Sequence, residues 1–426
     1  PSGGAGVQRW SKFVKYLREF GWEPIVYTPE NPEAPAIDNS LLKDIPENVT
    51  VIKQPIWEPY CLYKKFVGLK KEEKINAGFL TQKKKSNLAE KISVWIRGNM
   101  FIPDARKFWI KPSVKFLSEY LKKNPVDVIA STGPPHSMHL IAFELKKEMN
   151  IPWLADFRDP WTNIDFYKDL MLTKTSDAKH KKLELGVLKN ADRVVTVGWN
   201  MAKDFQKIFD RNIDVITNGF DEDDFLFDNC KTDKNFSISH IGAMNKDRNP
   251  HLFWEALSEL LNENLFLKND LKIRLIGKND VSVLQSIEEN GLNSFTEIIP
   301  YMMHDEVLKQ MCISQILLLP LNNTPNILGI VSGKIFEYIA AKRPVFVIGS
   351  ENGDAARIIN ETNTGVICDF KNKEKMKIEI LKMYNQYKEK KLTVETTDIT
   401  KYSRKNKAAE MSLLLNSMTG FSETKK

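Results

Sequence analysis

The chain has 426 residues, which is too long for one ordinary domain and makes two domains the natural expectation. Apolar residues make up 42% and charged residues 27%, values typical of a globular protein in which each half buries a core. The net charge of +7 is mild for this length, so it does not require nucleic acid as a partner and suits a small anionic ligand or an anionic membrane surface.

The longest apolar runs, such as ILLLPL and PVFVIG, have the length of a buried strand and fall well short of the roughly 18 residues that a membrane-spanning helix needs. The four cysteines are scattered without paired spacing. We therefore expect reduced thiols in a cytoplasmic protein, and neither a disulfide framework nor a zinc site. The cysteines are Cys61, Cys230, Cys312 and Cys368.

The chain opens with PSGGAGVQRW, a glycine-rich turn that leads into a helix. Trp10, Phe13 and Leu17 recur at helical spacing, and Gly21 ends the pattern. Because such a turn usually follows a strand, we expect that the given sequence begins inside a βα unit whose first strand precedes Pro1. The alternative is a helix that begins the protein.

Strands and helices alternate along the rest of the chain, which is typical of parallel sheets covered by helices on both faces. The predicted fold class is α/β, with two Rossmann-like, doubly wound parallel-sheet domains facing a cleft. Predicted strands cover residues 24–28, 49–53, 126–132, 151–157, 192–198, 213–219, 236–242, 271–277, 296–301, 315–321, 343–349 and 364–370. The predicted domains are residues 1–217, residues 218–395, and a segment 396–426 whose helix crosses back to the first domain.

The stretch GIVSGKIFEYIAAKRPVFVIG, residues 329–349, raises the question of what binds at its helix. It is not a P-loop, because Gly329 is one residue too close and Ile335 stands where a P-loop has Ser or Thr. Ser332 and Gly333 allow close approach to the backbone.

The amide groups at the start of this helix favour a phosphate or diphosphate, and Lys334 adds a full positive charge. Glu337 would repel phosphate and suits a pair of hydroxyl groups such as a ribose diol. The alternative from these residues alone is a capped helix with a favourable Glu in its first turn.

The sequence SGKIFEYIAAKRPVFVIG resembles the nucleotide-sugar site of GT-B fold glycosyltransferases, most closely the family 4 retaining enzymes. This resemblance implies that Glu337 holds the donor ribose and that Ser332, Gly333 and Lys334 lie near the diphosphate. Many relatives carry a second Glu eight residues earlier, near the donor sugar, where this chain has Gly329. The resemblance therefore leaves the identity of the sugar open.

Two further glycine-containing stretches resemble donor-binding segments of the same family. Gly3 and Gly4 match the glycine-rich loop under the donor diphosphate, and the alternative is an ordinary turn. In HIGAMNKDRNP, Gly242 ends a strand and Lys246 and Arg248 match the basic pair that contacts the diphosphate. The usual Arg just after the glycine is Ala243 here. A solvated cationic turn is the alternative for this stretch.

Two strand ends in the first half carry candidate catalytic residues. The resemblance suggests that His136, in STGPPHSMHL, positions the donor sugar, and the alternative is a helix-start histidine without a role. Asp156, Arg158 and Asp159 end a buried strand, where desolvated charges need partners. They either bind the acceptor or activate its hydroxyl group, or they form salt bridges within the loop.

Residues 57–91 combine aromatic side chains with lysines, a composition that suits the surface of an anionic membrane. The alternative is a solvated helical insertion that packs its own aromatic residues.

Taken together, the resemblance implies a retaining hexosyl- or N-acetylhexosaminyl-transferase that uses a nucleotide sugar without metal or cofactor. Its acceptor would be a glycan or lipid-linked glycan in surface polysaccharide synthesis, with lipopolysaccharide as one such product, on the cytoplasmic side and at the inner face of the membrane. A nucleotide-sugar epimerase of the same fold and a non-catalytic nucleotide-sugar-binding subunit remain as alternatives.

Overall fold

The protein is represented by a computed structural model, which describes residues 5–33, 44–59, 88–225, 230–263 and 265–420. The chain forms two compact units. Unit 1 comprises residues 1–217 and 405–426, and unit 2 comprises residues 218–404. None of the described helices combines the length and the apolar character needed to cross a bilayer.

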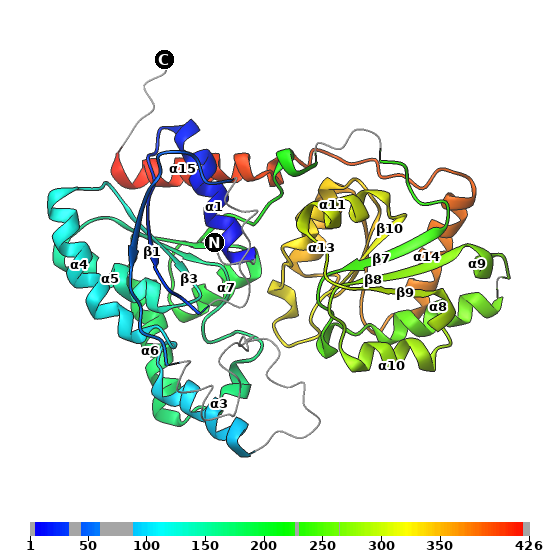
Figure 1. Cartoon of the computed structure of the whole chain (residues 1–426), viewed down its shortest axis with the longest axis horizontal. Coiled ribbons are helices and arrows are strands. Elements are labelled where there is room, and N and C mark those ends of the chain that lie inside the picture. The colour runs from blue at the N-terminus through cyan, green and yellow to red at the C-terminus, as the bar shows by residue number, and fades with distance from the viewer. Residues whose placement is uncertain (1–4, 34–43, 60–87, 226–229, 264, 421–426) are drawn as a thin grey trace. The chain divides into compact units, whose positions relative to one another are not determined.

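Unit 1 holds a four-stranded parallel sheet in the order β3-β4-β5-β6 and a separate pair of parallel strands, β1 and β2 (Figure 1). Every residue of the inner strand β4 is buried, as expected for a strand with helices on both faces. The strands are β1 (Ile25–Pro29), β2 (Thr50–Gln54), β3 (Ile129–Gly133), β4 (Trp153–Phe157), β5 (Arg193–Thr196) and β6 (Asp214–Val215).

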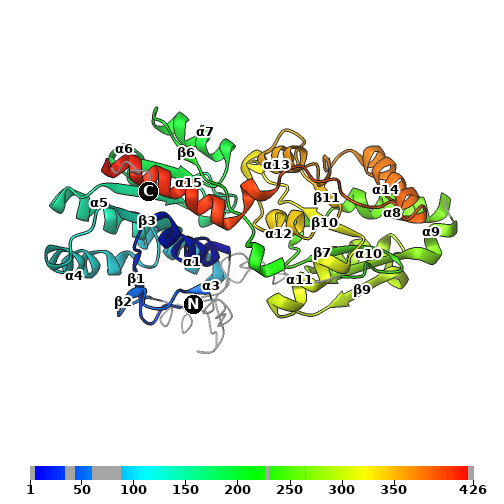
Figure 2. The ribbon, with the colours of Figure 1, turned by 90° about the horizontal axis from the view of Figure 1, so that it is seen from above.

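The helices of unit 1 include one from the far end of the chain. Met411 and Leu415 of α15 pack with Phe13 and Leu17 of α1 and with Leu154 of β4 in one apolar core. Figure 2 shows α15 running alongside α1. The α-helices are α1 (Ala5–Leu17), α3 (Leu88–Met100), α4 (Ile110–Lys123), α5 (Ser137–Met149), α6 (Lys174–Asn190), α7 (Trp199–Ile208) and α15 (Arg404–Thr419). Short 3-10 helices are η1 (Arg18–Phe20), η4 (Lys107–Trp109) and η5 (Tyr167–Leu170).

Unit 2 is built on a six-stranded parallel sheet in the order β12-β11-β10-β7-β8-β9 (Figure 1). The order reverses between β7 and β10, and in such sheets ligands bind beyond the carboxyl ends of the strands at this switch point. The strands are β7 (Phe236–Ile241), β8 (Leu271–Ile276), β9 (Thr296–Ile299), β10 (Ile316–Pro320), β11 (Val345–Ile348) and β12 (Gly365–Cys368).

Helices pack around this sheet, and buried side chains such as Phe253, Trp254 and Phe346 fill the core between them. The α-helices are α8 (His251–Glu263), α9 (Leu265–Asp270), α10 (Val281–Glu289), α11 (His304–Ile313), α12 (Lys334–Ala340), α13 (Asp354–Thr362) and α14 (Lys373–Lys388). The 3-10 helices are η6 (Glu222–Phe225), η7 (Lys246–Arg248), η8 (Asn293–Phe295), η9 (Ile327–Gly329) and η10 (Thr400–Tyr402).

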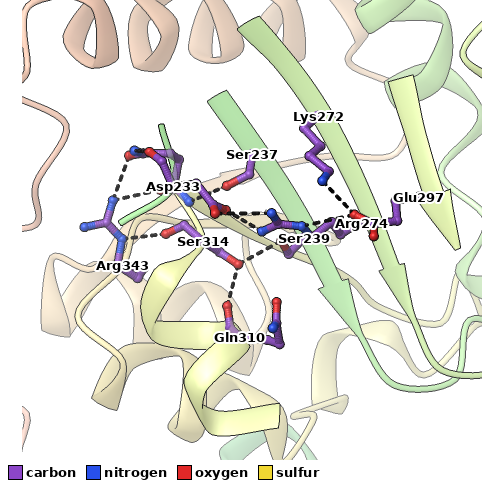
Figure 3. Close-up of polar contacts among 10 residues, drawn as sticks. Asp233, Ser237, Ser239, Lys272, Arg274, Glu297, Gln310, Ser314 and Arg343 are labelled. Carbon is purple, nitrogen blue, oxygen red and sulfur yellow. Dashed lines mark hydrogen bonds and ion pairs between the residues drawn. The ribbon is translucent and has the colours of Figure 1, made fainter. Parts of the chain in front are cut away.

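A polar network closes the amino ends of the strands in unit 2 (Figure 3). Arg274 of β8 pairs with Asp233, which lies ahead of β7, and its Nε lies 3.5 Å from the Glu297 carboxylate on β9. The Ser314 hydroxyl donates to the Ser239 hydroxyl at 2.8 Å. This network holds the connection into β7 in place. It lies at the amino ends of the strands, so the carboxyl ends remain for a binding site.

The predicted α/β class and the parallel sheets are confirmed. The expected strand at 213–219 is shorter, because after the bond from the Ile216 amide to the Thr196 carbonyl the chain leaves the sheet. Unit 2 extends to Arg404, beyond the expected boundary at 395, since Phe220 pairs with Ser403 and binds the backbone on both sides of it.

Candidate active site

The side chain of Lys334 lies over Gly242 at the carboxyl end of the central strand β7. Gly242 has a φ of +112°, a conformation that side chains rarely adopt. A methyl group added to its Cα would overlap the Lys334 ammonium. The glycine is therefore required twice, once for its backbone conformation and once for the approach of Lys334.

Lys334 shares this site with a second cation, Arg248. The Arg248 guanidinium donates to the Asn322 side chain at 2.7 Å and to the Ala243 carbonyl at 3.1 Å. Burial, and then the charge of Arg248, lower the pKa of Lys334 to about 7. A lysine that is held partly uncharged near neutral pH is poised to gain its full charge when an anion binds.

Glu337 lies one turn further along α12. Burial raises the pKa of its carboxyl group, while the neighbouring charges of His304, Lys334 and Arg404 act in the opposite direction. The neighbouring cations favour the charged form of this buried carboxylate. A charged carboxylate can accept hydrogen bonds from neutral hydroxyl groups.

Two histidines of this site were not assigned a binding role from the sequence. His304 begins α11, and its Nε2 lies 3.9 Å from the Asp224 carboxylate, which raises the pKa of His304. His240 is fully buried on β7, with Nδ1 3.0 Å from the Leu318 carbonyl. Burial and the charge of Lys334 lower its pKa well below the ordinary value, so His240 is neutral beneath the two cations.

The remaining donor-site candidates of unit 2 lie nearby but make fewer contacts. Lys246 is exposed on η7, two residues before Arg248 in the same short helix. The carbonyls of Ser332 and Gly333 accept from the amides of Ile335 and Phe336 as the first bonds of α12. The structure thus brings Gly242, Arg248, Lys334 and Glu337 together, and their role in donor binding stays a prediction.

In unit 1, Asp156 is the centre of a buried network at the end of β4. Its carboxylate accepts from Arg9 Nη2 at 2.8 Å, Trp10 Nε1 at 2.7 Å and Thr132 Oγ1 at 2.9 Å. Arg9 also donates to the Thr217 carbonyl at 2.9 Å. Asp156 is fully buried and its pKa is lowered by Arg9 against the effect of burial.

This geometry gives Asp156 a structural role. It lacks the exposure that a base acting on an acceptor hydroxyl requires, and its oxygens are already hydrogen-bonded. The alternative considered from the sequence was a salt bridge within the loop. Asp156 does form a salt bridge, but its partner is Arg9 on α1 and not Arg158 in the same loop. No local sequence pattern predicts a contact between residues 9 and 156.

The other predicted catalytic residues of unit 1 lie around the end of β3. Arg158 donates to the carbonyls of Gly133 and Pro134, and Asp159 is exposed. The His136 ring stacks on Trp161 with a centroid distance of 4.4 Å and is only 8% exposed. Burial lowers the pKa of His136 well below its ordinary value, so it is a neutral imidazole.

His139 on α5 follows His136 by three residues, is fully buried, and has its Nδ1 2.8 Å from the Ser131 hydroxyl. His136 Nδ1 and His139 Nε2 both lack a hydrogen-bond partner and both lie against the Cα of Gly133. Within the described ranges, no group of three or more His, Cys, Asp or Glu side chains is placed to hold a metal ion.

Some predictions fall on residues that the structure does not describe. Gly3 and Gly4 lie outside the described residues, as do most of residues 57–91 and Cys61. The other three cysteines are free thiols.

Comparison with known protein families assigns unit 2. Residues 221–400 match the family model described as glycosyl transferases group 1. The matched segment covers almost all of unit 2 and includes Gly242, Lys334 and Glu337. This part of the chain is therefore similar to group 1 glycosyl transferases. A search of curated proteins by sequence found no match.

Solved structures of similar fold cover nearly the whole chain. Sucrose-phosphate synthase from Thermosynechococcus elongatus is 12% identical, with 99% of this chain and 94% of that chain covered and a TM-score of 0.61. A glycosyltransferase from Rickettsia africae is 16% identical, with 98% and 96% covered and a TM-score of 0.61. WaaG, a glycosyltransferase involved in lipopolysaccharide biosynthesis, is 13% identical, with 99% and 97% covered and a TM-score of 0.55. These likenesses show the fold, which is the GT-B fold expected from the sequence.

Proposed function

We propose that the protein is a retaining glycosyltransferase that takes a sugar from a nucleotide-sugar donor. The observation that carries this proposal is the position of the Lys334 ammonium over Gly242, beside Arg248 and one helical turn from Glu337. A diphosphate fits two cations at the carboxyl end of a central strand, and a ribose diol fits the carboxylate. The match of the glycosyltransferase domain supports the same reading.

The chemistry follows from where charge develops. Cleavage of the bond between the sugar and the diphosphate leaves a nucleoside diphosphate with increasing negative charge. Lys334 and Arg248 stabilise this charge, and Lys334 becomes fully protonated as it forms. Lys246, exposed on η7, supplies a further charge two residues before Arg248. These cations take the place of a metal ion, so EDTA should leave the activity unchanged.

The sugar of the donor would contact backbone groups near Gly329, the position at which many relatives have a glutamate carboxylate. Gly329 ends η9, and Ser332 and Gly333 follow before α12 begins. We assign the donor to the hexosyl or N-acetylhexosaminyl class, with backbone amides as its partners. In unit 1, His136, Arg158 and Asp159 at the ends of β3 and β4 are the proposed contacts with the sugar and its acceptor.

The acceptor is proposed to be a glycan or lipid-linked glycan of a surface polysaccharide, made on the cytoplasmic side of the membrane. WaaG, whose fold is similar, acts in lipopolysaccharide biosynthesis.

The deciding experiment starts with a thermal-shift screen of nucleotide sugars and continues with the best stabiliser as the donor. Transfer should require an added acceptor, and proton NMR of the product should show the donor's anomeric configuration retained. Glu337→Gln should weaken donor binding by about tenfold, because hydrogen bonds to a charged group, about 1.5–3 kcal/mol each, become ordinary ones of about 0.5–1.5 kcal/mol each. The control is Glu306→Gln, an exposed position on α11.

Three results would contradict the proposal. Conversion of the donor to an epimer without acceptor would identify an epimerase. Donor binding without turnover on any acceptor would identify a binding subunit. Unchanged donor affinity in the Glu337→Gln variant would remove the ribose assignment.

A further inference from the structure

Two cysteines lie together at the amino ends of the strands in unit 2. Cys230 lies in the connection that leads into β7, and Cys312 lies in the last turn of α11. Their thiols are hydrogen-bonded to each other, and both side chains are half-buried. A disulfide bond needs two sulfur atoms that the fold already brings together, because its geometry tolerates little backbone movement.

The segments that carry the two cysteines are fastened to each other along their length. The Asp233 amide donates to the Ile313 carbonyl at 2.8 Å. The Gln315 side chain donates to the Asp233 carbonyl at 2.6 Å, and the Gln315 amide donates to the Ser237 hydroxyl at 2.9 Å. Figure 3 shows Asp233 and Ser237 in this polar network. The approach of the two thiols is therefore fixed by the same contacts that hold the start of β7.

The surroundings of the thiols differ in a way that suits a reaction between them. Burial, and then Cys230, raise the pKa of Cys312, while the nearby charge of Arg343 acts in the opposite direction. The Arg343 guanidinium is held in place because its Nε donates to the Ser314 carbonyl at 2.7 Å. A cation beside a partly exposed thiol favours the thiolate, which is the form of cysteine that reacts.

Cys368 provides the contrast within the same unit. It is fully buried on β12, and burial raises its pKa to about 12. A buried thiol in apolar surroundings is unreactive. Of the three cysteines that the structure describes, Cys230 and Cys312 are therefore the ones placed to react.

We propose that Cys230 and Cys312 form a redox-responsive pair that a hydroperoxide converts to a disulfide. The Cys230 thiolate attacks the peroxide, so that an S–O bond forms, the O–O bond breaks and an alcohol or water leaves with a proton. The Cys312 sulfur then attacks the Cys230 sulfur, so that the S–S bond forms, the S–O bond breaks and water leaves with the Cys312 proton. The two thiols together lose two electrons, which reduce the peroxide.

The bond would fasten the connection before β7 to the end of α11. The start of α11 already meets the preceding 3-10 helix η6, because His304 Nε2 lies 3.9 Å from the Asp224 carboxylate. Oxidation would therefore link α11 to this connection at a second point. We expect a more stable unit 2 and a more rigid α11 in the oxidised form. The proposal goes beyond the transferase assignment and does not depend on it.

The experiment treats the folded full chain with hydrogen peroxide and maps the products by peptide mass spectrometry. We expect a peptide pair joined through Cys230 and Cys312 that has lost two hydrogen atoms, and its separation by dithiothreitol. The oxidised chain should unfold at a temperature ~5–10 °C higher, because the bond restricts the unfolded state. Amide hydrogens of α11 should exchange about tenfold more slowly.

Matched variants test which thiols are responsible. Cys230→Ser and Cys312→Ser should each abolish the cross-link and the thermal shift, whereas Cys368→Ser should keep both. Separate sulfinic acids at Cys230 and Cys312, or a cross-link that forms only after unfolding, would overturn the proposal. Equal cross-linking to Cys61 or Cys368, or a cross-linked chain that unfolds at a lower temperature than the reduced chain, would overturn it as well.

Discussion

Raising the pH from 6 to 8.5 should weaken the binding of a nucleotide sugar, because Lys334 loses its charge in this range. Burial and Arg248 lower the pKa of Lys334 to about 7 in the free protein. The diphosphate needs the ammonium, so the complex keeps Lys334 protonated to higher pH. The affinity should therefore be greatest below pH 7 and fall above it, by up to about tenfold for each pH unit.

The size of the effect follows from the fraction of protonated Lys334. At pH 8.5 about one free protein in 30 carries the ammonium, so the affinity should be ~30-fold lower than at pH 6, or ~2 kcal/mol. A nucleotide sugar is the right probe because neither of its phosphates is a terminal monoester, whereas a terminal phosphate titrates near pH ~6. Isothermal titration at constant ionic strength measures the affinity directly.

Two variants separate Lys334 from its neighbours. Lys334→Met should bind weakly with no slope between pH 7 and 8.5. His304→Gln should keep most of the slope, although the hydrogen bond with Asp224 raises the pKa of His304. A flat wild-type profile, or a slope that survives in Lys334→Met, would refute the assignment of the titrating group.

Three more predictions concern stability. The pKa of Lys334 lies below its unfolded value of 10.5, so the charged side chain lowers the free energy of unfolding most at and below pH 7 and less as the pH rises toward 10.5. Lys334→Met should therefore raise the free energy of unfolding at pH 7 by ~1–3 kcal/mol after allowance for solvent screening. An unchanged or lower free energy of unfolding speaks against a desolvated ammonium. Gly242→Ala should cost ~1–3 kcal/mol and also weaken donor binding by displacing Lys334, which urea unfolding and titration would measure together. Asp156→Asn should cost ~3–5 kcal/mol because it leaves the buried Arg9 without a counter-charge, whereas Asp159→Asn at an exposed position should change stability by less than ~0.5 kcal/mol; equal effects would disprove the structural role of Asp156.

The parts of the site that could be predicted from sequence are local. Gly242 follows a clear strand pattern, and Lys334 and Glu337 share one short helix, so their relation depends on spacing alone. The fold was predictable for the same reason, since alternating strands and helices are read from neighbouring residues. Helix α4 was not predicted, although Val114 and Leu117 recur at helical spacing and are buried.

Long-range pairs could not be predicted in this way. The ion pair of Arg9 and Asp156 joins residues 147 positions apart, and no local pattern links them. His304 meets Asp224 because α11 packs on η6, which depends on the whole sheet order. A histidine at the start of a helix has the same local sequence whether it caps the helix or faces a carboxylate. The side-chain environment therefore had to come from the tertiary structure.

The place of α15 has a consequence for how the chain folds during synthesis. Unit 1 is interrupted in sequence by unit 2, and its core needs Ala408, Met411 and Leu415. A ribosome releases these residues after all of unit 2, so the unit whose translation starts first completes its core after unit 2 has emerged. A truncation that removes α15 would accordingly damage the amino-terminal half, while the segment 218–404, which is continuous, is the piece to express alone.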